Sequence, residues 1–303
     1  MCSRMNTITR AGSKVFENVT VDAIITLFTT RSSIINTAHF SSRTTISPIT
    51  SEYSDNLEQP FLIDFLFSNH SKLIQKIDSI EGKLIDYAEC ENACATSDFY
   101  IVKDLIEEIQ SPDLNIYYKL INTGTIEKYR NKWSDKQISY GGKYSFPVVK
   151  KELFHKALGR TYVKRASSKK IIFKGLNLLD GCLDENAEII PGKSTIVICN
   201  DDLNLLKFLL GILNSRLPIF YIKTKYASSS YCGGITFSKD MINNFPLHVP
   251  HSQQKEIIDV VDSIQMVKKT NPNADIQLLE KKLDDIIYRI YNLTDDEIKI
   301  LEG

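Results

Sequence analysis

Apolar residues recur at helical spacing along the C-terminal part of this chain. Over residues 257–267 they fall three and four residues apart, which places them on one helix face. After a break at residues 271–273 the same spacing resumes over residues 276–290. Thr294 and Glu297 then have the spacing of a capping box, which predicts a further short helix. We therefore predict a C-terminal helical hairpin that is followed by a short helix.

Upstream of the hairpin, the pattern is that of strands. Short runs rich in β-branched and aromatic residues alternate with turn residues such as Gly175 and Gly233. These runs are residues 161–163, 171–173, 195–199, 219–222 and 235–237. One helix interrupts them at residues 203–215. Because this helix is apolar nearly all round, we predict that it is buried.

The N-terminal part is also predicted to be rich in strands. Residues 14–30 and 34–46 contain many β-branched and aromatic types, whereas an apolar patch at 61–67 leads into apolar positions at 73–80 with helical spacing. These patterns together predict an α+β fold. The predicted division is a strand-rich segment at 1–60, a mixed α/β connecting segment at 61–138, a β-rich domain with one buried helix at 139–250, and a helical segment at 251–303.

The composition is that of a globular protein without net charge. Of 303 residues 43% are hydrophobic, and 37 Lys and Arg balance 37 Asp and Glu. The six cysteines are scattered through the chain, which indicates core thiols in a reducing compartment. Because the sequence contains neither an uncharged apolar stretch of about 18 residues nor a secretory signal, we expect a cytoplasmic protein.

The neutral total conceals a strongly basic segment. Residues 139–174 contain ten Lys and Arg against one acid, Glu152, and such an excess can neutralise DNA phosphates. A second polar loop with lysines and tyrosines precedes Gly233. The residues that we expect to contact DNA are Lys143, Lys150, Lys151, Arg160, Lys164, Arg165, Lys169, Lys170, Lys223, Lys225 and Tyr226. Charge alone leaves an alternative open, namely a solvated face that acids elsewhere in the fold balance.

Motifs for catalysis or metal binding are not evident. Cys90 and Cys94 are the closest cysteine pair, but without a nearby histidine or second pair we expect two thiols on a helix face. Asp78, Glu81 and Lys83 have the residue types of a metal-dependent nuclease, yet their close helical spacing indicates an exposed helix end. The sequence contains no P-loop, GxGxxG or Gly-x-Ser-x-Gly motif, so we predict no catalytic residue and no metal ligand.

Four segments, in order along the chain, resemble a family of DNA-modifying enzymes. LINTGTIEKYRNKW at 120–133 and GILNSRLPIFY at 211–221 resemble the target-recognition region of TaqI-like adenine-N6 DNA methyltransferases and fused restriction-modification enzymes. NFPLHVP at 244–250 also resembles the join between recognition domain and helical spacer in type I specificity subunits. LDDIIYRIYNLTDDEI at 283–298 is similar to the family's C-terminal ending, and residues 15–25 look like the last strand of the preceding methyltransferase domain.

The resemblance implies sequence-specific DNA binding, as the target-recognition part of a restriction-modification adenine-N6 DNA methyltransferase. Members that methylate carry a Gly-rich loop for S-adenosylmethionine and an Asn-Pro-Pro-Tyr tetrapeptide that holds the flipped adenine. This chain has neither, since its pair Asn271-Pro272 is followed by Asn273. We therefore expect no catalysis by this chain alone and no cofactor bound to it. S-adenosylmethionine is implied only for a catalytic partner or a missing half.

The expected partners are double-stranded DNA and, through the C-terminal helices, a methyltransferase or restriction subunit or a second copy of the chain. Two alternatives stay open at the level of sequence. The chain could be a protein-interaction module or a truncated relic that uses the apolar hairpin without binding DNA, a case that salt-sensitive duplex binding would exclude. It could also methylate DNA unaided, which transfer of labelled methyl groups would establish.

Overall fold

The structure is a computed structural model. It describes the backbone of residues 4–12, 23–29, 37–42, 45–50, 68–226, 230–231 and 234–303, and the side chains of residues 68–226 and 235–303. The chain folds into two compact units. One contains residues 1–74 with residues 224–226, and the other contains residues 75–223 with residues 227–303.

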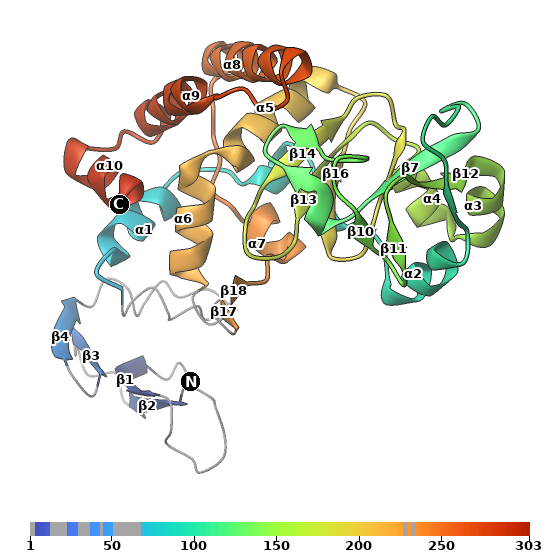
Figure 1. Ribbon diagram of the computed structural model, residues 1–303. Coiled ribbons are helices and arrows are strands. Elements are labelled where there is room, and N and C mark those ends of the chain that lie inside the picture. The colour runs from blue at the N-terminus through green and yellow to red at the C-terminus, as the bar shows by residue number, and fades with distance from the viewer. Residues whose placement is uncertain are drawn as a thin grey trace. The chain divides into compact units, whose positions relative to one another are not determined.

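The first unit contains a four-stranded sheet in the order β2-β1-β3-β4, drawn in blue in Figure 1. Its strands are β1 (Arg4–Gly12), β2 (Ala23–Thr29), β3 (Thr37–Ser42) and β4 (Thr45–Thr50). β1 pairs antiparallel with β2 and parallel with β3, and β3 forms an antiparallel hairpin with β4. The two N-terminal stretches predicted to be strand-rich therefore contain strands, although residues 14–22 and 30 of the first and residues 34–36, 43 and 44 of the second lie outside the described residues.

Two four-stranded sheets form the centre of the second unit (Figure 1). Their orders are β15-β7-β12-β6 and β14-β13-β16-β5, and all pairs are antiparallel except β15 with β7. The strands are β5 (Cys90–Asn92), β6 (Ile106–Glu108), β7 (Tyr117–Ile121), β12 (Pro147–Lys150), β13 (Lys170–Lys174), β14 (Gly181–Asp184), β15 (Ile189–Pro191) and β16 (Thr195–Cys199). Strands from both sides of residue 139 therefore share both sheets.

The structure also contains short two-stranded pairs. They are β8 (Ile126–Glu127) with β9 (Arg130–Asn131), β10 (Ile138–Ser139) with β11 (Lys143–Tyr144), and β17 (Ser230–Tyr231) with β18 (Gly234–Ile235). Ile172, Cys182 and Val197 of the second sheet pack with Ile121 and Ile126 in one buried cluster. The two sheets are therefore joined by a shared apolar core.

Helices surround the sheets. They are α1 (Ser71–Asp78), α2 (Thr96–Lys103), α3 (Lys151–Ala157), α4 (Arg160–Ala166), α5 (Leu203–Asn214), α6 (Arg216–Lys225), α7 (Lys239–Asn243), α8 (His251–Thr270), α9 (Gln277–Ile290) and α10 (Asp295–Glu302), with short 3-10 helices at Leu84–Asp86 and Thr123–Thr125. Within the described part of the chain, no single helix is long and apolar enough to cross a membrane. By length and composition alone, the pair α5 and α6, which is bent by 59°, is long and apolar enough when the two helices are taken together.

Two of the runs predicted as strands are helical, and this prediction was wrong. Residues 161–163 lie in α4 and residues 219–222 lie in α6. In α4 the buried side chains Tyr162 and Ala166 are four residues apart, so burial on one helix face outweighs the β propensity of the run. The prediction that Cys90 and Cys94 lie on one helix face was also wrong, because Cys90 lies in β5.

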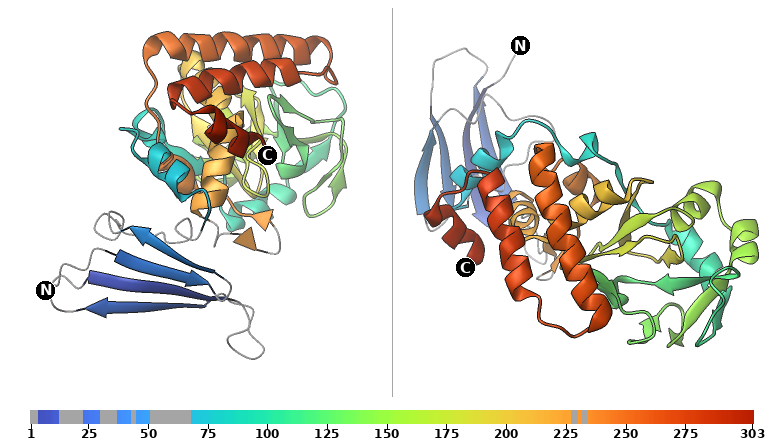
Figure 2. Two further views of the ribbon diagram at one scale, coloured as in Figure 1. Left: turned by 90° about the vertical axis from the view of Figure 1, so that its left-hand side faces the viewer. Right: turned by 90° about the horizontal axis from the view of Figure 1, so that it is seen from above.

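The predicted α+β class, the buried helix and the C-terminal helical hairpin are confirmed. α5 buries its residues 206 and 208–214, and α8 and α9 form the hairpin (Figure 2). The predicted capping box begins α10. The Thr294 hydroxyl accepts a hydrogen bond from the Glu297 amide at 3.3 Å, and the Glu297 carboxylate accepts one from the Thr294 amide at 2.8 Å.

The hairpin packs on α5 through its apolar face. Ile257, Val260, Val261 and Ile264 of α8 are buried, and α5 lies against α8. The contact is close at Gly211, where an added Cβ would lie 2.6 Å from Cγ2 of Ile257. The helices therefore approach along a line where only glycine fits.

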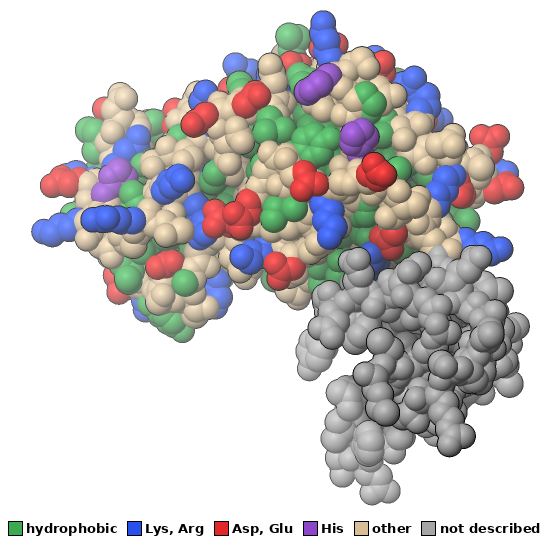
Figure 3. Space-filling model, turned by 180° about the vertical axis from the view of Figure 1, so that it is seen from behind, with side chains coloured by type: hydrophobic (Ala, Val, Ile, Leu, Met, Phe, Trp, Pro, Cys, Tyr) green, Lys and Arg blue, Asp and Glu red, His purple; other side chains and the backbone are tan. Residues whose placement is uncertain are grey.

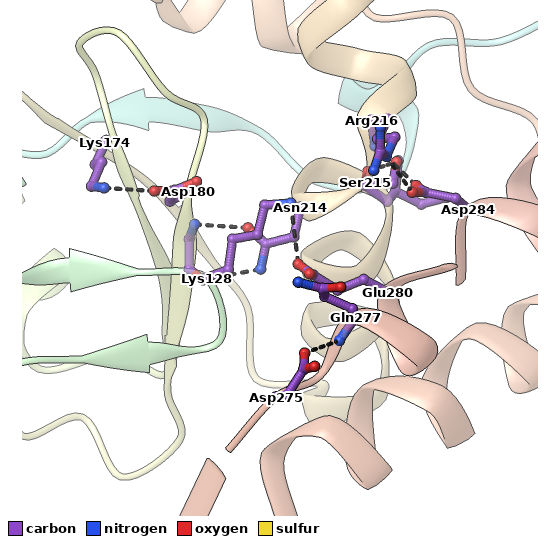
Figure 4. A network of polar contacts seen from close by, with 12 residues as sticks. Lys128, Lys174, Asp180, Asn214, Ser215, Arg216, Asp275, Gln277, Glu280 and Asp284 are labelled. Carbon is purple, nitrogen blue, oxygen red and sulfur yellow. Dashed lines mark hydrogen bonds and ion pairs between the residues drawn. The ribbon is translucent and has the colours of Figure 1, made fainter. Parts of the chain in front are cut away.

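Polar contacts near the end of α5 fix α5 to β14 and the hairpin to α6 (Figure 4). The Asn214 amide bonds the backbone N and O of Gly181 in β14, at 2.8 and 3.1 Å. The Asp284 carboxylate of α9 accepts bonds from the backbone N of Arg216 at 3.0 Å and from its Nε at 3.2 Å. The helical segment is therefore an integral layer of the second unit.

Candidate nucleic-acid interface

α3 and α4 display much of the basic segment, and their apolar sides fix them to the first sheet. Phe154 of α3 and Tyr162 of α4 are buried in one cluster with Tyr118 of β7 and Val149 of β12. The Tyr162 hydroxyl donates to the carbonyl of Pro191 in β15 at 2.9 Å. Because one side of each helix is anchored in this way, the remaining positions are available to solvent.

Several of the predicted cations lie on that solvent-facing side. Arg160 and Lys164 of α4 and Lys169 after α4 are exposed, and so is Lys156 at the end of α3, which was not among the predicted contacts. Lys151 begins α3, where its ammonium lies 4.8 Å from the centroid of the Tyr118 ring. These cations thus lie on or beside two helices that contact each other.

Ion pairs reduce the basic excess only in part. Within residues 68–226 and 235–303, six of the ten cations between residues 139 and 174 have no ion pair, namely Lys143, Lys151, Lys156, Arg160, Lys164 and Lys169. Lys150 lies 3.8 Å from Glu152, and both groups are exposed. Lys143 lies on β11, outside the two helices. Within the described residues, ion pairs with acids therefore neutralise four of these ten cations and leave the other six without a partner of opposite charge.

Lys170 is the exception among the predicted contacts, because its side chain is fully buried. Its ammonium donates to the carbonyls of Ala166 at 2.9 Å and Ser168 at 3.0 Å, and to the carboxylate of Asp184 at 2.5 Å. Burial lowers the pKa of Lys170 from its ordinary value, and the charge of Asp184 opposes that change. Contrary to the prediction, Lys170 is held inside the protein by these contacts and does not lie on the exposed surface of α3 and α4.

Arg165 joins α4 to β5. Its Nε lies 3.2 Å from the carboxylate of Glu91, its Nη2 bonds the second carboxylate oxygen, and its Nη1 donates to the Ala93 carbonyl at 3.4 Å. The hydrogen bond from Arg165 lowers the pKa of Glu91 below its usual value. Arg165 is thus engaged within the protein and holds α4 in place.

The predicted contacts of the second polar loop, Lys223, Lys225 and Tyr226, are divided between the two units. Lys223 is an exposed residue of α6, which lies away from α3 and α4 in the views of Figures 1 and 2. Lys225 and Tyr226 belong to the first unit, and both have interactions within the protein. Residues 227–229, 232 and 233 of the loop lie outside the described residues. The structure therefore does not bring Lys223 to the surface of α3 and α4.

A pocket of about 710 Å³ lies beside α4. α4 and the turn after it contribute Arg160, Thr161, Lys164, Arg165 and Ser168, and the ends of β5 and β16 contribute Glu89, Glu91, Cys199, Asn200 and Asp201. β5 pairs antiparallel with β16, with Cys90 opposite Ile198, so the start of one strand lies beside the end of the other. Burial raises the pKa of the Cys199 thiol, which is consequently neutral at physiological pH.

The predicted residues account for only one part of this pocket. Arg160, Lys164 and Arg165 were identified from charge, whereas Glu89 and Asp201 were not. The spacing of Glu89 and Glu91 places both on one side of a strand, but nothing local indicates that β5 pairs with β16. Within the described side chains, no cluster of three or more His, Cys, Asp or Glu has an arrangement that could hold a metal ion.

The charges are mixed on the face of the molecule shown in Figure 3. Lys and Arg side chains are distributed over this face, including the left of that view, where α3 and α4 lie, and acidic side chains occur among them. The surface therefore combines cations that can contact phosphates with carboxylates that can accept hydrogen bonds.

Comparisons with known proteins found likenesses among solved structures. No protein-family model matches the chain, and no curated protein matches it. The chain is similar to the type IIL restriction-modification enzyme MmeI, solved in complex with DNA, with a TM-score of 0.47 and 9% identity. It is also similar to the type IIG restriction endonuclease BpuSI, with a TM-score of 0.43 and 9% identity. These matches cover 96% and 94% of this chain but 43% and 44% of those chains, so this chain spans less than half the length of either.

Proposed function

We propose that this chain binds double-stranded DNA through the surface of α3 and α4. The observation that carries the proposal is the group of cations on two adjacent helices that have no ion pair within the described residues. Such cations neutralise phosphates and release counterions, which is the main source of affinity for duplex DNA. The neutral total charge of the chain does not oppose this, because the local field acts over about 10 Å at ordinary salt.

The finer proposal is that the chain is the target-recognition part of a restriction-modification adenine-N6 DNA methyltransferase. Its support is the ordered resemblance of four segments to TaqI-like enzymes. Under this proposal the methyl donor S-adenosylmethionine belongs to a catalytic partner or a missing half. The contacts to phosphates position the duplex, and polar side chains near α4 are available to read bases.

The packing of the hairpin argues against a module that only binds proteins. That alternative needs the apolar face of the hairpin to be free, whereas this face packs on α5. The exposed apolar side chains of the hairpin include Met266 and Leu278, and isolated side chains of this kind are common on protein surfaces. The basic helices are therefore the better candidate for a binding surface.

Fluorescence anisotropy with a labelled random-sequence duplex tests the proposal. At about 50 mM salt we expect binding, and at about 200 mM salt we expect it to weaken by about a thousandfold if six phosphates are contacted. The same titration with a duplex library and sequencing of the bound fraction tests target recognition. The absence of binding at low salt would exclude the proposed function, whereas binding without any selected sequence would exclude only the recognition role.

A further inference from the structure

We propose that the pocket beside α4 binds a guanine nucleotide, whose phosphate contacts Arg160 and Lys164 and whose base donates hydrogen bonds to Glu89 and Asp201. This inference goes beyond duplex binding and does not depend on it. The source of the nucleotide is either a free guanine nucleotide or an unpaired guanosine in DNA. Both present the same phosphate and the same base edge to the pocket.

The charges that line the pocket are complementary to a ligand with two kinds of group. Arg165 and Glu91 satisfy each other through their ion pair. Arg160 and Lys164 on α4, and Glu89 and Asp201 at the strand ends, have no ion pair within the described residues. A ligand that fills the pocket must therefore carry an anionic group for the cations and hydrogen-bond donors for the carboxylates.

The α4 side of the pocket suits a phosphate. Arg160 and Lys164 are four residues apart in a helix, so their side chains lie on the same face. Arginine offers a planar fork of donors that matches two phosphate oxygens, and lysine adds a compact charge. Thr161 also lines the pocket, and its hydroxyl can donate to the same anion, whereas the Ser168 hydroxyl donates to the Lys164 carbonyl at 2.7 Å.

The carboxylates select guanine among the bases. Guanine carries adjacent donors on its Watson–Crick edge, N1–H and N2–H, and the two oxygens of one carboxylate can accept both. Adenine and cytosine present a single amino donor beside an acceptor nitrogen, whose lone pair would face a carboxylate oxygen. Thymine presents one N–H between two carbonyls. Either Glu89 or Asp201 can thus accept both donors of guanine, which no other base offers side by side.

The size of the pocket is compatible with this ligand. A volume of about 710 Å³ lies within the range of roughly 300–1,000 Å³ that is typical of small-molecule sites. The neutral Cys199 thiol adds no charge, and Asn200 contributes an amide beside the carboxylates. The pocket therefore has room for a base, a ribose and a phosphate at once.

Isothermal titration calorimetry with GMP, AMP and CMP tests the proposal directly. We expect GMP to bind at least about tenfold more tightly than AMP or CMP, because hydrogen bonds to charged groups contribute more than ordinary ones. Glu89→Gln and Asp201→Asn replace exposed carboxylates by isosteric amides, and we expect the preference for GMP to fall by about tenfold in at least one of them. Glu152→Gln, on the exposed side of α3, removes the same charge outside the pocket and should retain the preference.

A second titration distinguishes the two sources of the nucleotide. It compares duplexes that contain one unpaired guanosine, one unpaired adenosine, or no unpaired base. Binding of free GMP supports a free nucleotide, and tighter binding of the guanosine duplex alone supports an extrahelical nucleotide. The proposal is overturned if neither shows a guanine preference, or if the preference is the same in Glu89→Gln, Asp201→Asn and the parent. Salt-sensitive binding of the fully paired duplex would persist in that case, so the two proposals fail independently.

Discussion

Two neighbouring lysines, Lys169 and Lys170, have opposite environments. Lys170 is buried with three acceptors around its ammonium, whereas Lys169 is exposed. We expect Lys170→Ala to lower the free energy of unfolding by about 3–5 kcal/mol, because it leaves the buried carboxylate of Asp184 without its partner. Lys169→Ala should change it by less than about 0.5 kcal/mol.

Urea unfolding monitored by circular dichroism measures both variants under the same conditions. Equal effects of the two substitutions would mean that the ion pair with Asp184 does not hold the sheet. Lys169 and Lys170 also show why the residues of a basic segment cannot be treated alike, since cations that are adjacent in the sequence can have unrelated partners.

The ion pair between Arg165 and Glu91 predicts a loss of stability in acid. The pKa of Glu91 is lowered in the folded protein, so its contribution to stability is complete above the ordinary value of 4.5 and is lost as pH falls through the lowered pKa. The pair is partly exposed, which limits the contribution to about 1 kcal/mol. The parent and Glu91→Gln should therefore differ in urea midpoint at pH 7 and converge in acid. A difference that is constant with pH would contradict this assignment.

At the scale of elements, the crossing of α5 and α8 depends on Gly211. Alanine normally favours a helix over glycine by about 1 kcal/mol. Here its Cβ would lie 2.6 Å from Cγ2 of Ile257 and 2.9 Å from Cγ2 of Val261, and both methyl groups sit on stiff branched side chains. We therefore expect Gly211→Ala to destabilise the protein by about 1–3 kcal/mol, despite its higher helix propensity.

Thermal unfolding of Gly211→Ala and of Asn204→Ala measures this effect, since Asn204 is an exposed position in the same helix. Asn204→Ala also raises the helix propensity of α5, but at an exposed position, so it reports that gain without the close contact that Gly211→Ala makes with α8. A rise in melting temperature for both variants would show that the two helices separate at little cost.

The sequence predicts those elements in which the spacing of apolar residues repeats over several helical turns. The hairpin repeats its apolar spacing over two helices, and α5 is apolar nearly all round, so both were predicted. α4 has seven residues, and its run of Thr161, Tyr162 and Val163 has strand propensity, so only its burial in the fold shows that it is helical. The pocket was unpredictable for another reason. Glu89 and Asp201 come together only because β5 pairs with β16.

At the scale of the whole molecule, the charge is unevenly distributed although the total is zero. The basic helices α3 and α4 lie in one region of the second unit, and the last 53 residues contain eleven acids against seven bases (Figures 1 and 2). An acidic segment repels a duplex while a basic one attracts it, so under the proposed function this field would orient DNA before contact. The proposal therefore places the DNA contact on α3 and α4 and not on the C-terminal helices.

The salt dependence of duplex binding measures how many cations take part. Each phosphate contact adds about 0.9 to the slope of log affinity against log salt, so the triple variant Lys156→Ala, Lys164→Ala, Lys169→Ala should lower the slope by about 2–3. The double variant Lys281→Ala, Lys282→Ala removes exposed cations of α9, far from α3 and α4, and should leave the slope unchanged. Because all five lysines are exposed, neither variant should alter the fold. An equal decrease in both variants would mean that the net charge of the chain governs binding, and the surface of α3 and α4 would then have no special role.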